Sequence, residues 1–175
     1  DKISTGKSGA KFGVSVADAL ALHARASKMK LIDAKGFAVH IGSQIKDLGP
    51  LEDAFRVMRK LAEDARAQGL SVERLDLGGG LGIAYRADDP VVEVERWGRA
   101  MVEATRDLPC ELVLEPGRYL VGNAGVLLTE VLVRKRGEDK HFVIVDAAMN
   151  DLLRPALYDA YHTIVPVELP DPEVE

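Results

Sequence analysis

A run of glycines follows a short apolar segment near the middle of the 175-residue chain. Gly78, Gly79 and Gly80 come directly after residues 74–77, and Gly82 follows closely. Because glycine has no Cβ, such a loop can turn sharply and can let a phosphate approach its N–H groups. The spacing fits neither G-x-G-x-x-G nor a P-loop, which disfavours a dinucleotide or ATP site. A simple tight turn and a barrel-type phosphate site both stay open.

A second polar segment, with the sequence Glu-Pro-Gly-Arg, follows another apolar run and contains Glu115 and Arg118. These two side chains could form a mutual ion pair at a strand end. They could also do chemistry, because a carboxylate facing a pyridine nitrogen keeps that nitrogen protonated and makes the ring an electron sink. The arginine would offer a planar fork to a phosphate or a carboxylate.

A histidine, His40, ends a third apolar run and is followed by the small or polar residues Gly42, Ser43 and Gln44. A lone histidine in such a place is more often a packed core residue than a ligand. The small polar residues after it nevertheless suit an open site. There the imidazole could stack on a flat ring, and the Ser43 hydroxyl could hydrogen-bond a phosphate.

Arg154 and Tyr158 are four residues apart near the C-terminal end of the chain. If this segment is a helical turn, both side chains share one face and together could bind a carboxylate. The alternative is a surface arginine beside a half-buried tyrosine. Pro155 is compatible with a helix only in its first turn.

The remaining histidines and the single cysteine indicate no site. His23, His141 and His162 lack the spacing of metal ligands. His23 lies in an amphipathic segment and is predicted to be on the surface. Cys110 comes just before an apolar run, so we expect a packed small residue rather than a nucleophile.

The apolar periodicity predicts the elements that position these residues. Helices are expected over 16–29, 51–68 and 91–105, and strands over 37–41, 74–77 and 111–114. This alternation indicates an α/β fold with parallel strands joined by crossover helices. Ligands of such proteins bind at the carboxyl ends of the strands, which is where the three polar segments fall.

The alternation of predicted strands and helices ends after Gly122. Strand-like runs over 126–134 and 140–146 with a short connection predict an antiparallel hairpin, and residues 163–167 also read as a strand. We therefore expect two domains, 1–122 and 123–175. Few βα units are visible, and half a barrel would leave open sheet edges. Together with the absent initiator Met, this suggests a piece of a longer chain.

Composition narrows the class of protein. The chain is 47% hydrophobic and 29% charged, with a formal net charge of −5. Interspersed charges without a basic block argue against nucleic acid as a partner. No apolar run is long enough to span a membrane, so no membrane association is expected. A single cysteine cannot form an internal disulfide, which fits a cytoplasmic location.

Five segments, taken in order, resemble those of one enzyme family: residues 2–13, 40–45, 75–82, 115–118 and 151–158. The chain resembles the fold-type III, alanine-racemase-like decarboxylases that use pyridoxal 5'-phosphate (PLP), and among them the diaminopimelate decarboxylases. This resemblance implies the C-terminal part of a PLP-binding (β/α)8 TIM barrel over 1–122, followed by the start of a β-domain over 123–175. It also implies a homodimer with shared active sites.

The resemblance also implies roles for individual residues. His40 would stack on the PLP ring, and Glu115 would pair with the pyridine nitrogen; both count as catalytic. The implied cofactor-binding residues are His40, Ser43, Gly78, Gly79, Gly80, Glu115, Gly117 and Arg118. Substrate carboxylates would be bound by Arg118, Arg154 and Tyr158. No metal is expected.

The implied reaction is decarboxylation of meso-2,6-diaminopimelate to L-lysine and CO2, a step of lysine biosynthesis. The family's Schiff-base lysine is expected upstream of Asp1, and its Cys-Glu motif and a PLP-contacting tyrosine downstream of Glu175. The 175 residues alone are therefore expected to be inactive. Three alternatives remain: an ornithine- or arginine-type decarboxylase, a non-catalytic PLP-binding relative, and a phosphate-binding barrel that never uses PLP.

Overall fold

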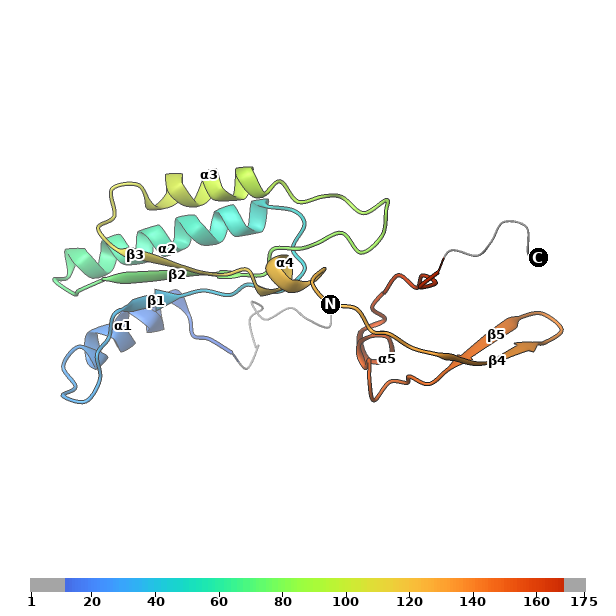
Figure 1. Ribbon diagram of the computed structural model, residues 1–175. Helices are drawn as coiled ribbons and strands as arrows, with labels where there is room; N and C mark the ends of the chain where they lie inside the picture. Colours follow the sequence, from blue (N-terminus) through green and yellow to red (C-terminus); the bar gives the residue numbers. More distant parts are fainter. Residues whose placement is uncertain (1–11, 169–175) are drawn as a thin grey trace. The chain divides into compact units, whose positions relative to one another are not determined.

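The computed structural model describes residues 12–168 (Figure 1). The chain divides into two compact units. Residues up to Ile83 and residues 90–124 form the first unit, and residues 84–89 together with those from Gly125 onward form the second. No helix within the described range is long and apolar enough to cross a membrane.

A parallel sheet forms the centre of the first unit. Its strands are β1 (Gly36–Ala38), β2 (Arg74–Gly79) and β3 (Glu111–Glu115), in the order β1-β2-β3. Both neighbouring pairs are parallel, and Leu75 of β2 lies between Phe37 and Leu112 in register. All three carboxyl ends therefore meet at one edge, as the sequence predicts.

The helices of the first unit are α1 (Val16–Ala26), α2 (Gly49–Ala67), α3 (Val94–Thr105) and α4 (Gly117–Val121). The α1 helix begins where expected, because the Ser15 hydroxyl accepts the Asp18 N–H at 3.1 Å. The α2 helix carries Pro50 in its first turn, and Gly69 just beyond its end has a φ of 76°. The α2 and α3 helices pack side by side along the sheet (Figure 1).

The core lies between α2, α3 and β2. Phe55 of α2 is 1% exposed and Leu75 of β2 is fully buried, while Trp97 and Met101 of α3 close the layer from outside. Burying each large apolar side chain stabilises the fold by roughly 1.5–3 kcal/mol. This packing fixes the central strand, and with it the loop that follows the strand.

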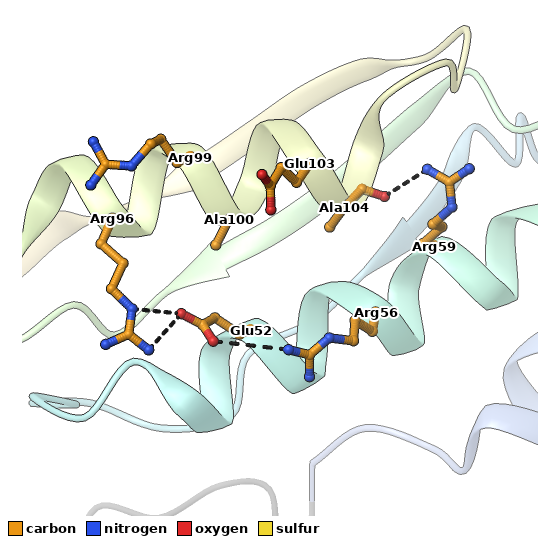
Figure 2. Close-up of a pocket in the computed structure, with 8 residues that line it drawn as sticks. All are labelled: Glu52, Arg56, Arg59, Arg96, Arg99, Ala100, Glu103 and Ala104. Carbon is orange, nitrogen blue, oxygen red and sulfur yellow. Dashed lines mark hydrogen bonds and ion pairs between the residues drawn. The ribbon is translucent and has the colours of Figure 1, made fainter.

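A charged groove of about 480 Å³ runs between α2 and α3 (Figure 2). Arg96 reaches across it and donates to the Glu52 carboxylate from Nε and Nη2, both at 2.9 Å. Arg59 Nη1 donates to the Ala104 and Arg106 carbonyls at 3.1 and 2.8 Å. These carbonyls are among those that a helix leaves unpaired at its C-terminal end. The charged side chains that line the groove thus hold the two helices to each other.

The second unit is built on an antiparallel hairpin of β4 (Val131–Arg136) and β5 (His141–Val145). The Gly137 N–H donates to the Lys140 carbonyl at 2.8 Å and closes the turn. At the open end, hydrogen bonds from the Thr129 hydroxyl and the Glu130 N–H lower the pKa of Asp146. A single helical turn, α5 (Arg154–Tyr158), follows with Pro155 at its start.

Several predicted boundaries are wrong. The β2 strand does not stop at Leu77 but continues to Gly79, because Gly79 pairs with Glu115 of β3. The structure gives residues 163–167 no strand, and it shows the short helix α4, which the sequence analysis did not predict. The hairpin itself is confirmed, although its first strand begins only at Val131.

His23 is also placed differently from the prediction. It is 6% exposed rather than on the surface. Its Nε2 lies 2.8 Å from the Ser71 carbonyl oxygen, and its ring is 4.8 Å from that of Phe37. A buried imidazole is tolerated here because a carbonyl pairs with its polar edge.

Candidate active site

At the glycine loop the backbone segments that follow the three strands approach one another closely. Gly78 has a φ of 70°, and a Cβ added to it would collide with the Val39 carbonyl after β1. A Cβ on Gly79 would collide with the Glu115 carbonyl at the end of β3. Glycine is needed here because its neighbours on both sides occupy the space of a side chain.

The same close contact continues beyond the strands. Gly80, with a φ of 89°, leaves no room for a Cβ beside the Gly42 carbonyl. The Ile45 N–H donates to the Gly80 carbonyl at 2.9 Å, and the Gly82 N–H donates back to Ile45 at 2.9 Å. The loops after β1 and β2 are therefore joined as if the strands had been extended.

A depression of about 470 Å³ opens at the carboxyl ends of the strands. His40 and Glu115, predicted from separate segments, both line it. Its remaining lining residues are Phe12, Gly13, Ala38, Val39 and Asp76. His40 is exposed, so it is not the packed core histidine considered as an alternative. The volume is within the usual range of small-molecule sites, roughly 300–1,000 Å³.

Arg118 lies in α4, directly after β3, and its partner is not Glu115. Its Nη1 donates to the Gln44 side-chain oxygen at 3.2 Å. The mutual Glu115–Arg118 ion pair considered from the sequence is thus replaced by a contact to a neutral amide. Ser43 is half-buried, next to Gln44 in the chain, and Gly117 is exposed with open space where a Cβ would be.

Arg154 and Tyr158 lie in the second unit, at the two ends of α5. Arg154 Nη1 donates to the Tyr85 hydroxyl at 3.2 Å, and its guanidinium carbon is 5.6 Å from the centre of the Tyr85 ring. Tyr158 is 42% exposed. The predicted helical turn is confirmed, but the aromatic partner of Arg154 is a residue that the sequence analysis did not select.

Two contacts were therefore missed from the sequence, those of Gln44 and Tyr85. Gln44 adjoins the selected Ser43, and Tyr85 closely follows the glycine run. Their partners are 74 and 69 residues away in the chain. No local periodicity connects residues so far apart, although the polar character of Gln44 beside a selected residue was a usable signal.

Cys110 is half-buried and packs against the core, as expected. Burial raises the pKa of its thiol, and the Arg66 charge only partly opposes this shift. The thiol therefore stays protonated near neutral pH, which fits a packed residue rather than a nucleophile. Among residues 12–168, no group of three or more His, Cys, Asp or Glu side chains could hold a metal ion.

A parallel sheet with a depression at its carboxyl edge is the usual arrangement of an α/β ligand-binding domain, and comparison with known families shows which family this domain belongs to. The chain belongs to the pyridoxal-dependent decarboxylases: residues 1–122 match the model of their pyridoxal binding domain. This confirms the predicted cofactor class and, at the level of α/β class, the predicted fold.

Within the pyridoxal-dependent decarboxylases, the chain is similar in sequence to diaminopimelate decarboxylases. The chain is 49% identical to the diaminopimelate decarboxylase of Neisseria meningitidis serogroup A over 166 residues, and 41% identical to that of Aquifex aeolicus, in both cases over 95% of this chain. These alignments cover 41% and 40% of the relatives, so the chain spans about two-fifths of their length. The resemblance seen in the five segments is thereby confirmed.

Solved structures similar to this chain include the same kind of enzyme as the sequence relatives. The diaminopimelate decarboxylase of Helicobacter pylori complexed with L-lysine matches with a TM-score of 0.86 and 38% identity, over 95% of this chain and 42% of that one. The lysine/ornithine decarboxylase of Vibrio vulnificus complexed with cadaverine has a TM-score of 0.80 but 24% identity, over 92% of this chain and 44% of that one. The latter likeness shows the fold alone.

We expect Gly78→Ala to disrupt the site, because the new methyl group meets the Val39 carbonyl at a positive φ. The cost should be roughly 2 kcal/mol or more, from strain and overpacking together. Denaturant unfolding of the full-length protein measures it. Gly98→Ala is the matched control, since Gly98 lies in α3 with open space around it and should tolerate alanine. Equal stability of the two variants would contradict this account of the loop.

Proposed function

We propose that the protein containing this chain is a PLP-dependent carboxy-lyase that converts meso-2,6-diaminopimelate to L-lysine and CO2 in lysine biosynthesis. The observation that carries the proposal is the depression that brings His40 and Glu115 together, within a domain that matches the pyridoxal binding family. The substrate is supported by the 49% identity to a diaminopimelate decarboxylase and by the neighbouring structure complexed with L-lysine.

The residues at the strand ends fit such a cofactor. An exposed imidazole and an exposed carboxylate border one depression, which has room for a flat ring. When bound, PLP supplies the electron sink that takes up the electron pair left by the departing CO2. Glu115 would hold a proton on the ring nitrogen, and His40 would stack on the ring face. Gly117 has open space where a Cβ would stand, and a phosphate could approach its backbone from that side.

Further roles follow the same proposal. Ser43 and the backbone of Gly78, Gly79 and Gly80 would contribute to the phosphate site. Arg118, with Arg154 and Tyr158 from the second unit, would bind the carboxylates of the substrate. Both arginines contact a neutral partner in the structure, a glutamine amide or a tyrosine hydroxyl, so each keeps its positive charge for an anionic ligand.

We also propose the finer architecture. Residues 1–122 would be the C-terminal part of the (β/α)8 barrel and 123–175 the start of the β-domain. The change from parallel strands joined by helices to an antiparallel hairpin supports this division. A cytoplasmic homodimer with shared active sites would complete the enzyme, and sedimentation of the full-length protein with and without PLP would test the dimer.

Substrate choice is tested by CO2 release from the full-length protein, with diaminopimelate, ornithine and arginine assayed side by side at equal concentration. We expect release from diaminopimelate at a rate well above that from the other two. Faster release from ornithine or arginine would move the protein to another branch of the family. Binding of PLP without release from any of the three would favour a non-catalytic relative.

Glu115→Gln should leave PLP bound but slow decarboxylation at least tenfold, because a neutral amide holds a ring proton less well than a carboxylate. Turnover and PLP absorbance of the full-length protein measure the two effects. Glu111→Gln makes the same chemical change at the other end of β3, where the side chain pairs with Arg74, and should leave turnover unchanged. Equal effects of the two substitutions would count against the role of Glu115.

Arg154→Ala should raise the KM for diaminopimelate roughly tenfold or more while PLP retention stays the same, because it removes a charge-assisted contact to the substrate. Steady-state kinetics and PLP titration separate the two. Arg134→Ala, on the exposed hairpin strand β4, is the control for loss of one arginine from the second unit. Loss of PLP with an unchanged KM would instead assign Arg154 to the cofactor.

A further inference from the structure

Gln44 occupies a position that costs free energy and that nothing in its local sequence requires. Its φ is 60°, in the left-handed region that residues other than glycine seldom adopt, at a cost of roughly 1–2 kcal/mol. The side chain is half-buried. The left-handed backbone conformation of Gln44 must therefore be compensated by the hydrogen bonds of its side chain.

The Gln44 amide connects the segments that follow three different strands. Gln44 itself follows β1. Its Nε2 donates to the Ile83 carbonyl at 2.5 Å, and its Oε1 accepts the Ile83 N–H at 3.2 Å, in the segment after β2. The same Oε1 accepts from Arg118 Nη1 at 3.2 Å, in the helix after β3.

These contacts fix which side of the amide faces the arginine. An amide oxygen has two lone pairs, and both are used, by Ile83 and by Arg118. Rotating the amide by half a turn would place its NH2 group against the Ile83 N–H and the Arg118 guanidinium, which are both donors. The oxygen therefore faces Arg118, and the guanidinium is held by an acceptor that carries no charge.

The absence of charge on this partner has a consequence for binding. A carboxylate at position 44 would accept the same hydrogen bond, but it would neutralise the guanidinium and compete with an anionic ligand for it. A neutral amide orients Arg118 and leaves its charge available.

We propose that Gln44 is a positioning residue that fixes the orientation of Arg118 for the anionic group of the bound ligand without neutralising its charge. The inference rests on the proposed function, in which Arg118 binds a phosphate or a carboxylate. It adds that the orientation and the available charge of Arg118 both depend on Gln44, through an amide anchored on the backbone of Ile83.

Two substitutions separate this role from a merely structural one. Gln44→Glu keeps an acceptor for Arg118 and for the Ile83 N–H, adds a charge, and loses the donor to the Ile83 carbonyl, whereas Gln44→Ala removes all three hydrogen bonds. If the side chain only stabilised the loops, each variant would lose the same ligand affinity whether or not Arg118 is present. If it preserves the charge of Arg118, we expect the glutamate variant to be the more severe, with ligand affinity reduced about tenfold or more.

The test is a double-mutant cycle in the full-length protein, combining each Gln44 variant with Arg118→Ala. Two constants are measured: the Kd for PLP by absorbance titration of the apoprotein, and the KM for diaminopimelate. Arg118→Ala alone should change one of these two constants. We expect Gln44→Glu to change that same constant in the protein that has Arg118, and to have no effect on it in the Arg118→Ala protein. If the glutamate variant does not fold, the Gln44→Ala arm still measures the coupling between Gln44 and Arg118.

The outcomes distinguish this inference from the proposed function. Additive effects on both constants would overturn the inference even in an active decarboxylase, as would an alanine variant more severe than the glutamate variant. An Arg118→Ala protein with both constants unchanged would overturn it too. A protein that decarboxylates none of the three amino acids, yet shows coupling on the Kd for PLP, would refute the proposed function and support the role of Gln44.

Discussion

The site depends on the close approach of neighbouring backbones at the carboxyl ends of three parallel strands. At Gly78 and Gly79 the carbonyls of β1 and β3 segments occupy the space that a side chain would need. Parallel pairing brings the strand ends to one edge, but ordinary side chains would keep the following loops apart. Because glycine has none, the loop after β2 lies directly between its neighbours. His40 and Glu115, which come from the two outer segments, can then border one depression.

The packing behind the sheet makes this approach possible. Phe55 of α2 presses on β2, and α3 closes the layer with Trp97. The helices are held to each other by apolar contacts and by the charged side chains that line the groove. Among these, Arg59 donates hydrogen bonds to the carbonyls at the end of α3. The site residues themselves contribute little to this core. Rigid elements thus carry stability, and the loops at their ends are left to carry chemistry.

The features that could be predicted from the sequence depend on residues close together in the chain, and those that could not depend on residues far apart. Helix α1 begins directly after its capping residue Ser15, and α2 carries Pro50 in its first turn. Both features could be predicted, because capping and the proline ring act within a few residues of the chain. The continuation of β2 to Gly79 could not be predicted, since its cause is pairing with a strand more than thirty residues away. The burial of His23 depends likewise on a distant carbonyl. Candidate site residues could be selected where an apolar run stops at polar residues, but their hydrogen-bond partners could not be predicted.

The arginines of this chain show why partners matter as much as residue types. In the groove between the helices, Arg96 faces a carboxylate at 2.9 Å, so its charge is used within the fold. Arg118 and Arg154 contact an amide oxygen and a hydroxyl instead. A neutral acceptor fixes the direction of a guanidinium and leaves its charge uncompensated within the fold. An arginine in such a place stabilises the folded chain less than a paired one does, and it is correspondingly better prepared to bind a phosphate or a carboxylate.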